Sequence, residues 1–287
     1  MRTGVVIIPS ENIQSSIKKP NRTFIMRKLF PFSFLFLLSC AVVPMTGRKQ
    51  FVAIPSSQMI ALSSESYARV LEEGTLSANQ TYVNQVRTVG KRLTAAVETY
   101  LKQNNLQSAL EGYQWQYNVL VSEELNAWCM PGGQIAFYEG ILPVCQDENG
   151  IAVVMGHEIA HAVAQHGNER MSQQLAIQMG GIALSEALKT QKQQTIDLAL
   201  LAFGVGATVG VELPFSRTHE LEADELGLYF MAMAGYDPRL APEFWERMAA
   251  KSTSRPPEFL STHPDPSNRI QHLNQIMPRA LEYYQAR

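Results

Sequence analysis

The chain has 287 residues, of which 46% are hydrophobic and 17% charged, and its formal net charge at pH 7 is only −2. Because the sequence contains no block of like charge, its composition argues against a nucleic-acid partner. The length is enough for one well-buried core and is short for two full-sized domains once a leader is set aside. We therefore expect a single folded domain.

Residues 1–39 have the pattern of a secretory leader. The basic residues Arg27 and Lys28 precede an uncharged apolar run over residues 29–38. This run is too short to cross a bilayer but has the length of a signal-peptide core. Met26 stands immediately before the basic pair, so it is a candidate for the true start of the protein.

The apolar run ends in the sequence Leu37-Leu38-Ser39-Cys40. This pattern resembles a bacterial lipobox, which implies cleavage before Cys40 and acylation of its thiol and new amino terminus. Ala41 stands where lipoproteins kept in the inner membrane typically carry Asp, so the resemblance favours the periplasmic face of the outer membrane. Several acyl chains anchor a protein stably without a spanning helix. The alternative is a leader that is simply cut away.

Two further cysteines, Cys129 and Cys145, would then lie in an oxidising compartment. Paired cysteines tend to bridge there, so we predict a disulfide between them. Two buried thiols are the alternative, and a zinc role is disfavoured because the spacing is not that of a CxxC motif.

The predicted elements follow in chain order. Residues 40–56 contain Pro44, Gly47 and Pro55 and are predicted to form an extended, lipidated tether. Residues 57–107 carry apolar side chains at helical spacing, which predicts two helices. Residues 113–121 and 134–142 alternate apolar and polar side chains, which predicts two strands with a turn before the second.

From Asp147 onward the sequence is predicted to be helical apart from its connections. Residues 195–213 include an uncharged run between Asp197 and Glu212, which is shorter than the 18 or so residues expected of a membrane span. We predict a buried helix here, with close apposition to lipid as the alternative. The expected fold is thus α+β and mostly helical, with residues 57–287 as one domain and a small sheet beside its central helix.

The sequence Gly156-His157-Glu158-Ile159-Ala160-His161 contains an HExxH motif. Two imidazoles four residues apart share one face of a helix and can bind one Zn²⁺, with Glu158 beside the metal-bound water. Otherwise every residue from Ile151 to Ala164 is apolar or glycine, which predicts a helix buried all round. Burying polar side chains is costly unless each has a partner, and a metal supplies one. Three hydrogen-bonded core residues are the alternative.

Catalytic zinc usually has three protein ligands. The extended pattern HExxHxxGxxH fails, because Ala164 and Gly167 stand where it requires Gly and His. His166 follows His157 by nine residues, and at about 100° per residue this turns it to the opposite side of a continuous helix. We therefore predict a solvent-facing histidine at position 166.

The better source of a third ligand is the segment 216–224, which is predicted to open a helix that ends near Gly235. Within its apolar face lie Glu220 and Asp224, while Glu222 projects the other way. Buried carboxylates are paired or bind metal. We predict Glu220 as the third ligand and Asp224 as the acceptor of a proton from a ligand histidine, which orients that ring.

The alternative for these two carboxylates is a salt bridge to Arg217 or Arg269, because buried carboxylates usually find such a partner.

An HExxH motif followed by a downstream ExxxD helix resembles the zinc peptidase family of the CAAX prenyl endopeptidase and the heat-shock protease HtpX. The lipobox and the single domain look most like its LoiP-like periplasmic lipoprotein branch. The similarity runs from Thr46-Gly47-Arg48 to Arg269. It implies a zincin-like, gluzincin domain with one Zn²⁺ per chain. By the same resemblance the ligands are His157, His161 and Glu220, the catalytic acid/base is Glu158, and Asp224 is the acid that accepts a hydrogen bond from a ligand histidine.

The resemblance also covers Asn126-Ala127 and Pro131-Gly132-Gly133, which precede an edge strand near the active-site helix. An extended substrate can pair with such a strand through main-chain hydrogen bonds. Asn126, Ala127, Gly132 and Gly133 are therefore candidate substrate-binding residues, and an ordinary hairpin is the alternative.

Thr262-His263-Pro264 and Arg269 occupy the place of a downstream HP…R element of the family. This implies that His263 donates a hydrogen bond to the tetrahedral oxyanion, or enters as an inhibitory fourth ligand, and that Arg269 lies beside the ligand shell. A histidine in a turn before a helix is the alternative, since Asp265 and Pro266 provide turn chemistry.

The combined expectation is a membrane-anchored periplasmic zinc endopeptidase that cuts unfolded or flexible envelope proteins. The rival is a non-catalytic, zinc-containing, chaperone-like binding protein of the envelope. Glu158 argues against the rival, because a purely structural zinc site has no use for an uncoordinated carboxylate beside an open position. Action on prenylated substrates is disfavoured by the lack of spanning helices and by the leader.

Overall fold

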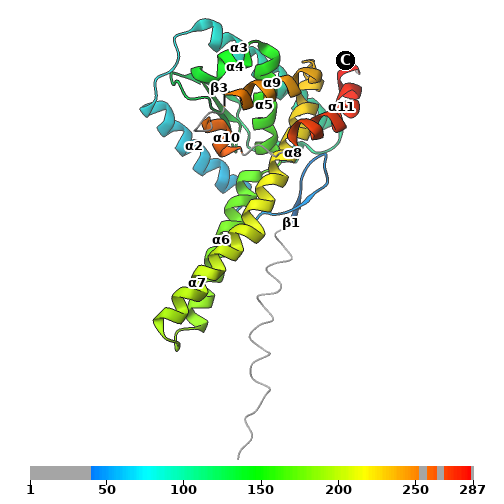
Figure 1. Cartoon of the computed structure of the whole chain (residues 1–287). Coiled ribbons are helices and arrows are strands. Elements are labelled where there is room, and N and C mark those ends of the chain that lie inside the picture. Colours follow the sequence, from blue (N-terminus) through cyan, green and yellow to red (C-terminus); the bar gives the residue numbers. More distant parts are fainter. Residues whose placement is uncertain (1–39, 252–256, 264–267, 286–287) are drawn as a thin grey trace, which may run out of the picture. The chain divides into compact units, whose positions relative to one another are not determined.

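The computed structural model describes residues 40–251, 257–263 and 268–285 (Figure 1). The predicted leader therefore lies outside the described residues, as do Pro264 and the turn residues after it. The architecture is α+β and mostly helical with small sheets, which confirms the predicted fold class.

Two long helices and a three-stranded sheet form the first half of the domain. The helices are α2 (Ser56–Glu73) and α3 (Gln80–Gln103), and the strands are β3 (Gln116–Leu120), β4 (Ala127–Met130) and β5 (Gln134–Tyr138). Strand β5 lies in the middle, parallel to β3 and antiparallel to β4, so β4 is at one edge of the sheet. The two predicted helices and the two predicted strands are present, and β4 is an additional strand.

The second half is helical. It consists of α4 (Leu142–Cys145), α5 (Glu148–Val163), α6 (His166–Ala187), α7 (Gln193–Ala207), the π-helical turn η4 (Thr208–Glu212), α8 (Leu213–Met233), α9 (Ala241–Ala250), α10 (Glu258–Thr262) and α11 (Arg269–Gln285), together with the 3₁₀ turns η2 (Gln107–Leu110), η3 (Glu139–Ile141) and η5 (Pro238–Leu240). Helix α5 is buried along its length between α3, β4 and α8, as its apolar sequence predicts.

Residues 40–56 are not an extended tether. Strands β1 (Cys40–Val42) and β2 (Lys49–Phe51) pair antiparallel, and the turn between them uses positive φ angles at Met45 and Gly47. Val43 is buried in the main hydrophobic core. The chain from Cys40 onward therefore belongs to one compact unit.

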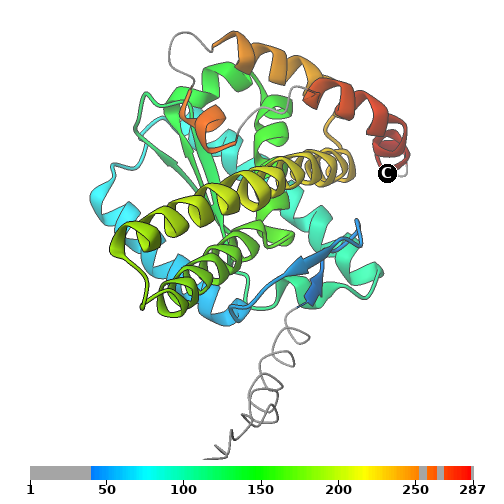
Figure 2. The same cartoon turned by 60° about the horizontal axis from the view of Figure 1, so that its bottom comes forward.

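Helices α7 and α8 are joined through η4 into one continuous helix, Gln193–Met233, rather than opening at Ser216 as predicted. By length and composition this helix could cross a membrane, and none of its most apolar 18-residue window is buried. The predicted burial of residues 195–213 is therefore wrong. Apolar residues here form an outward face instead, because α7 packs on one side against α6 and, among the described residues, no further layer covers its other side (Figures 1 and 2).

The predicted disulfide between Cys129 and Cys145 is not formed, and both residues are free thiols. Cys129 lies on the edge strand β4, whereas Cys145 is buried at the end of α4. Burial raises the pKa of both thiols, so they behave as packed, protonated side chains.

Helices α5 and α8 approach each other at two glycines. A Cβ atom placed on Gly227 would lie 2.7 Å from the backbone nitrogen of His157, and one on Gly156 would lie 2.8 Å from the carbonyl oxygen of Gly227. The helices therefore touch backbone to backbone beside the HExxH motif. No other residue type leaves room for this contact.

Replacing Gly227 by alanine should destabilise the fold by about 1–3 kcal/mol or more, because the added methyl group forces α5 and α8 apart. Denaturant unfolding monitored by circular dichroism measures this change. Gly204→Ala is the matched control, since nothing lies within 4 Å of its Cβ position in α7. Alanine there should be neutral or stabilise by roughly 0.5–1 kcal/mol. Equal stability of Gly227→Ala and the parent would contradict the close contact.

Candidate metal centre

Helix α5 presents the three polar residues of the HExxH motif. The helix is capped by Asp147, whose side chain accepts hydrogen bonds from the backbone amides of Asn149 and Gly150. One turn separates His157 from His161, and their ring centroids lie 4.6 Å apart. His157 and Glu158 are buried, and His161 is partly exposed.

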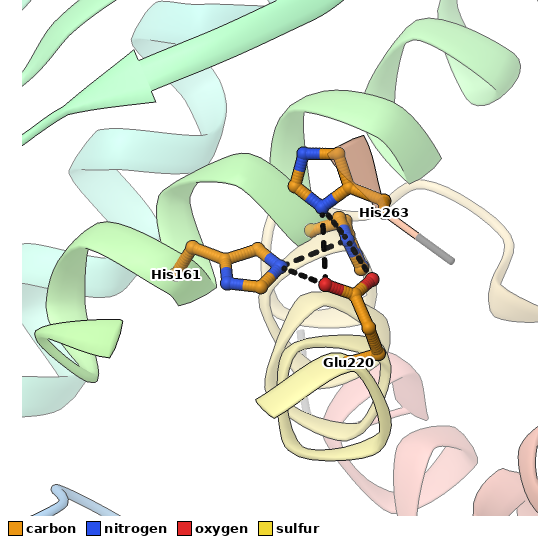
Figure 3. A group of neighbouring side chains, drawn as sticks. His161, Glu220 and His263 are labelled. Carbon is orange, nitrogen blue, oxygen red and sulfur yellow. Dashed lines mark hydrogen bonds and ion pairs between the residues drawn. The ribbon is translucent and has the colours of Figure 1, made fainter. Parts of the chain in front are cut away.

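Helix α8 brings Glu220 to the same point (Figure 3). The Nε2 atoms of His157 and His161 are 3.1 Å apart, and the Glu220 carboxylate lies 3.3 Å from the first and 3.5 Å from the second. His263, at the end of α10, completes the group. Its Nδ1 lies 3.3 Å from His157 Nε2 and 3.2 Å from Glu220. All four donor atoms lie within 4.8 Å of one another.

The donor set fits a zinc ion. His157 Nδ1 donates a proton to Asp224 at 2.9 Å, so the Nε2 atom of that ring is the nitrogen left to face a metal. His161 Nδ1 is likewise engaged by another ring, so two Nε2 atoms and a carboxylate face one another. Such converging acceptors repel unless a cation lies between them. A tetrahedral zinc site, with bonds of about 2.0–2.1 Å to nitrogen, spaces its donors roughly 3.3 Å apart.

The pKa values of the donor residues also indicate that a positive charge is favoured at this centre. Burial disfavours the charged form of His157, but hydrogen bonds with Asp224 and Glu220 outweigh it and raise the pKa of this histidine to about 9. Burial lowers the pKa of His161 well below its usual value, so this ring is neutral. Burial opposes ionisation of Glu220, but the histidines around it hold its pKa well below the usual range. The centre thus holds an anion that attracts any available cation.

Glu158 lies beside the donor group without joining it. Its Oε1 is 3.4 Å from His263 Nε2, within ion-pair range, yet the atom is buried and makes no hydrogen bond among the described residues. Burial raises the pKa of this carboxyl group, and the neighbouring His263 and His157 oppose the shift. A buried carboxylate with a free oxygen is suited to taking up a proton from a reacting molecule.

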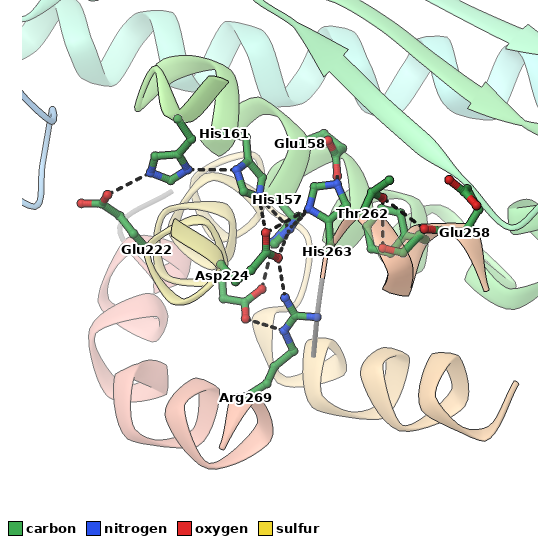
Figure 4. Close-up of polar contacts among 12 residues, drawn as sticks. His157, Glu158, His161, Glu222, Asp224, Glu258, Thr262, His263 and Arg269 are labelled. Carbon is green, nitrogen blue, oxygen red and sulfur yellow. Dashed lines mark hydrogen bonds and ion pairs between the residues drawn. The ribbon is translucent and has the colours of Figure 1, made fainter. Parts of the chain in front are cut away.

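Asp224 and Arg269 support the donors from below (Figure 4). Arg269 Nε donates to Asp224 at 2.7 Å, its Nη2 donates to Glu220 at 3.0 Å, and its guanidinium lies 3.8 Å from the centre of the Trp245 ring. Glu220 and Asp224 therefore contact the candidate ligand histidines, as predicted, and also form the salt bridge to Arg269 that was the alternative. Arg217 is exposed on α8.

His166 is buried and contacts a metal-site histidine, so the predicted solvent exposure is wrong. Its Nδ1 lies 2.9 Å from His161 Nδ1, and its Nε2 lies 2.9 Å from Glu222. The helix does not continue through this region. Gln165 has a positive φ of 55°, which ends α5 and starts α6 in a new direction, so counting helical turns from His157 fails here.

The proton positions in the hydrogen-bonded series of His161, His166 and Glu222 follow from the partner of each ring nitrogen. Burial lowers the pKa of His166 to about 4, so the ring is neutral near pH 7. His161 then donates from Nδ1 to His166, which donates from Nε2 to Glu222. This arrangement orients His161 as Asp224 orients His157, because the partner of one ring nitrogen determines which nitrogen is left for a metal.

Glu222 is also buried, in contrast to the predicted outward projection. It accepts hydrogen bonds from the Thr46 hydroxyl and from Arg48 Nε, the latter at 2.7 Å. Arg48 also forms two hydrogen bonds to Glu169, at 2.8 and 3.1 Å. The segment Thr46-Gly47-Arg48 marked one end of the family resemblance, but nothing in its sequence pattern indicated that it closes the space beneath His166.

A cleft of about 620 Å³ opens onto the centre. It is lined by residues 126–131, by residues from the first turns of α6 and of α8, and by Glu158, His161, Glu220 and His263. The candidate residues Asn126 and Ala127 therefore line the cleft. Gly132 and Gly133 lie in the turn after β4, packed near Ile60 and Trp115.

We expect His166→Ala to weaken zinc binding by about 10- to 100-fold, because it removes the group that orients His161. Competition with a chromophoric chelator measures the affinity. The matched control is His272→Ala on α11, which lies outside this hydrogen-bonded chain and should leave the affinity unchanged. Equal zinc affinities for both variants would show that His166 only fills space.

The sequence of this chain is similar to those of known peptidases. A sequence profile described as peptidase family M48 matches residues 88–277. The mitochondrial metalloendopeptidase OMA1 of Schizosaccharomyces pombe is 31% identical over 240 residues, which cover 83% of this chain and 66% of that protein. The mitochondrial metalloendopeptidase OMA1 of Bos taurus is 30% identical over 283 residues, covering 95% and 53%. The beta-barrel assembly-enhancing protease of Escherichia coli is 28% identical over 176 residues, covering 58% and 36%.

The matched region thus spans from about a third to about two thirds of these relatives' own lengths. The zinc peptidase family predicted from the HExxH and ExxxD motifs is confirmed, and the periplasmic lipoprotein branch stays a prediction. Because the profile covers well over half of the sequence and includes the helices that carry His157, His161 and Glu220, the chain belongs to peptidase family M48.

Proposed function

We propose that this protein is a zinc-dependent endopeptidase that hydrolyses peptide bonds in extended, unfolded segments. The observation that carries the proposal is the convergence of two imidazole nitrogens and one carboxylate from α5 and α8, with the uncoordinated carboxylate of Glu158 beside them. His157, His161 and Glu220 would hold the ion. When bound, zinc would supply a water of pKa about 7 and would polarise the substrate carbonyl group.

The other side chains around the donors transfer the proton, orient the ligand rings and compensate charge. Glu158 accepts the proton of the attacking water and returns it to the leaving amine, which its buried position and raised pKa favour. Asp224 and His166 hold the two ligand rings in the orientation that directs their Nε2 atoms inward. Arg269 offsets the negative charge of Glu220 and Asp224.

His263 keeps the two roles implied by the family resemblance. Its ring reaches both the donor group and Glu158, so it contacts the position that a substrate carbonyl oxygen or a fourth ligand would use. As a hydrogen-bond donor it would stabilise the oxyanion, and as a fourth ligand it would restrain activity.

The second candidate, a non-catalytic zinc-containing binding protein, shares the cleft and the donors. Glu158 separates the two functions, since a structural site closes its coordination and needs no free carboxylate beside it. The same residue therefore provides the test.

Purified Glu158→Gln should retain zinc and lose the ability to cleave an unfolded protein such as casein, by about 10²- to 10⁴-fold, because glutamine cannot accept the proton. Metal content and peptide release measure the two properties. Glu72→Gln, an exposed residue of α2, is the matched control and should cleave as the parent does. Cleavage by Glu158→Gln at the parental rate would reject the mechanism.

The substrate is proposed to bind as an added strand. Strand β4 pairs with β5 on one side only, in the part of the chain that the structure describes, and its other side lines the cleft. Main-chain hydrogen bonds to an edge strand recognise extended backbone and leave side-chain preference to nearby pockets. This favours unfolded or flexible envelope proteins as substrates, including their transiently exposed segments.

Backbone methylation of a peptide substrate tests this binding mode. In a paired strand alternate amides point toward the partner, so N-methylation on one set should reduce kcat/KM at least about tenfold while the other set is tolerated. Peptides methylated at consecutive positions away from the scissile bond serve as one another's controls. A loss of activity without alternation, or no loss at any position, would argue against strand addition.

We further propose that the protein is anchored through acylated Cys40 at the periplasmic face of the outer membrane. The lipobox carries this proposal, and the similarity to a bacterial protease named for β-barrel assembly supports a place in the cell envelope. The OMA1 relatives are named as mitochondrial, so sequence similarity alone does not identify the membrane at which this chain lies. Mass spectrometry of the mature amino terminus should detect an acylated Cys40, and an unmodified terminus at another residue would refute the anchor.

A further inference from the structure

Helices α6 and α7 form an arm that projects from the body of the domain (Figures 1 and 2). The two helices pack against each other along the arm. The sequence has no charged residue between Arg170 and Glu186 in α6, and none between Asp197 and Glu212 in α7 and η4. Two adjacent helical stretches are therefore uncharged while standing outside the core.

The outward faces of the arm are apolar. Ile182 of α6 is 70% exposed, and Leu198 and Leu201 of α7 are 67% and 65% exposed. On α7 these side chains continue along one face to Val205 and Val209, at the spacing of successive helical turns. An exposed apolar surface of this extent on a folded domain marks an interaction site.

The dimensions of the arm suit a bilayer surface better than a bilayer crossing. The 14 uncharged residues between Asp197 and Glu212 extend about 21 Å as a helix, less than the roughly 30 Å of a hydrocarbon core. An interfacial helix instead lies in the membrane plane with its apolar face about 5–10 Å deep. Lys192 at the tip of the arm is placed to meet lipid phosphates, whereas Lys189 beside it forms an ion pair with Glu186.

The anchoring end of the domain lies at the base of the same arm. Strand β2 pairs with the strand that begins at Cys40. At the end of β2 the backbone amide of Phe51 donates to Glu169 at 3.3 Å, and just after it the amide of Ala53 donates to Ser172 at 2.9 Å. Both acceptors belong to the first turns of α6. The strand that begins at Cys40 and the base of the apolar arm therefore lie at the same end of the domain (Figure 1).

We propose that the outer face of the α6–α7 arm lies in the surface of a phospholipid bilayer and holds the active-site cleft next to the membrane. The cleft reaches the base of the arm, where Arg170, Gln174 and Leu213 are among its lining residues. A protein held in this way meets polypeptide segments as they enter or leave the lipid. The shared orientation with Cys40 rests on the proposed acylation, whereas the contact of the arm with lipid does not.

The test uses the full chain with a tryptophan placed on the arm by Leu201→Trp. Vesicles of phosphatidylethanolamine and phosphatidylglycerol are prepared with and without brominated acyl chains, which quench only tryptophans that reach them. Leu76→Trp is the matched control, because Leu76 is 52% exposed and follows the end of α2 that is remote from α6. Fluorescence of the parent, which has three tryptophans, is subtracted.

The tryptophan of Leu201→Trp should be quenched strongly and that of Leu76→Trp little, also when Cys40→Ser removes the acylation site. Adding Val205→Glu to Leu201→Trp should abolish most of the quenching, since a carboxylate opposes insertion. Both positions are exposed, so zinc content should match the parent and confirm folding. Failure of the casein assay would not alter either result.

Three results would overturn the proposal. One is equal quenching at the two positions. Another is a concentration-dependent blue shift of the Leu201→Trp fluorescence without vesicles, which would identify a second copy of the chain as the occupant. The third is the same shift on adding casein without vesicles, which would identify the arm as a binding surface for unfolded substrate.

Discussion

The contact between Gly156 and Gly227 is the constraint on which the centre depends. Both glycines lack a Cβ atom, so α5 and α8 approach until their backbones touch. His157 follows Gly156 directly, and Glu220 lies on α8 two turns before Gly227. The distance between the helix axes therefore determines the distance between the donors. Because both helices are rigid and packed in the core, the donors are held in position without a loop that would have to order first.

The charges of the centre impose a second requirement, because four carboxylates besides Glu158 are buried close to one another. Glu220 and Asp224 are compensated by Arg269 from α11, and Glu222 and Glu169 by Arg48 from the segment after β1. Breaking one such pair leaves a buried charge without compensation, which is costly. Arg48, near the start of the domain, and Arg269, near its end, therefore both stabilise the buried carboxylates around the donors of α5 and α8.

The helix Gln193–Met233 connects two different environments. Its C-terminal half packs against α5 and α11 and carries Glu220, while its N-terminal half lies outside the core and presents apolar side chains to the surroundings. The π-helical turn η4 marks the change between the halves. One element thus serves both the metal centre and the surface proposed to meet lipid, which explains why its sequence is apolar over a length that a soluble core helix does not need.

The sequence by itself determined the elements that rest on local patterns. The burial of α5 followed from its almost entirely apolar composition, and the meeting of His157, His161, Glu220 and Asp224 at one place followed from helical spacing and from the cost of burying charge. The structure alone decided the features that depend on where the chain turns and which surfaces meet. His166 lies beside His161 because the left-handed backbone at Gln165 ends one helix and redirects the next. Glu222 is buried because a distant arginine reaches it, and α7 is exposed because no layer of the part of the chain that the structure describes covers it. Periodicity reports which side of a helix is apolar, but whether that side meets protein is a property of the whole fold.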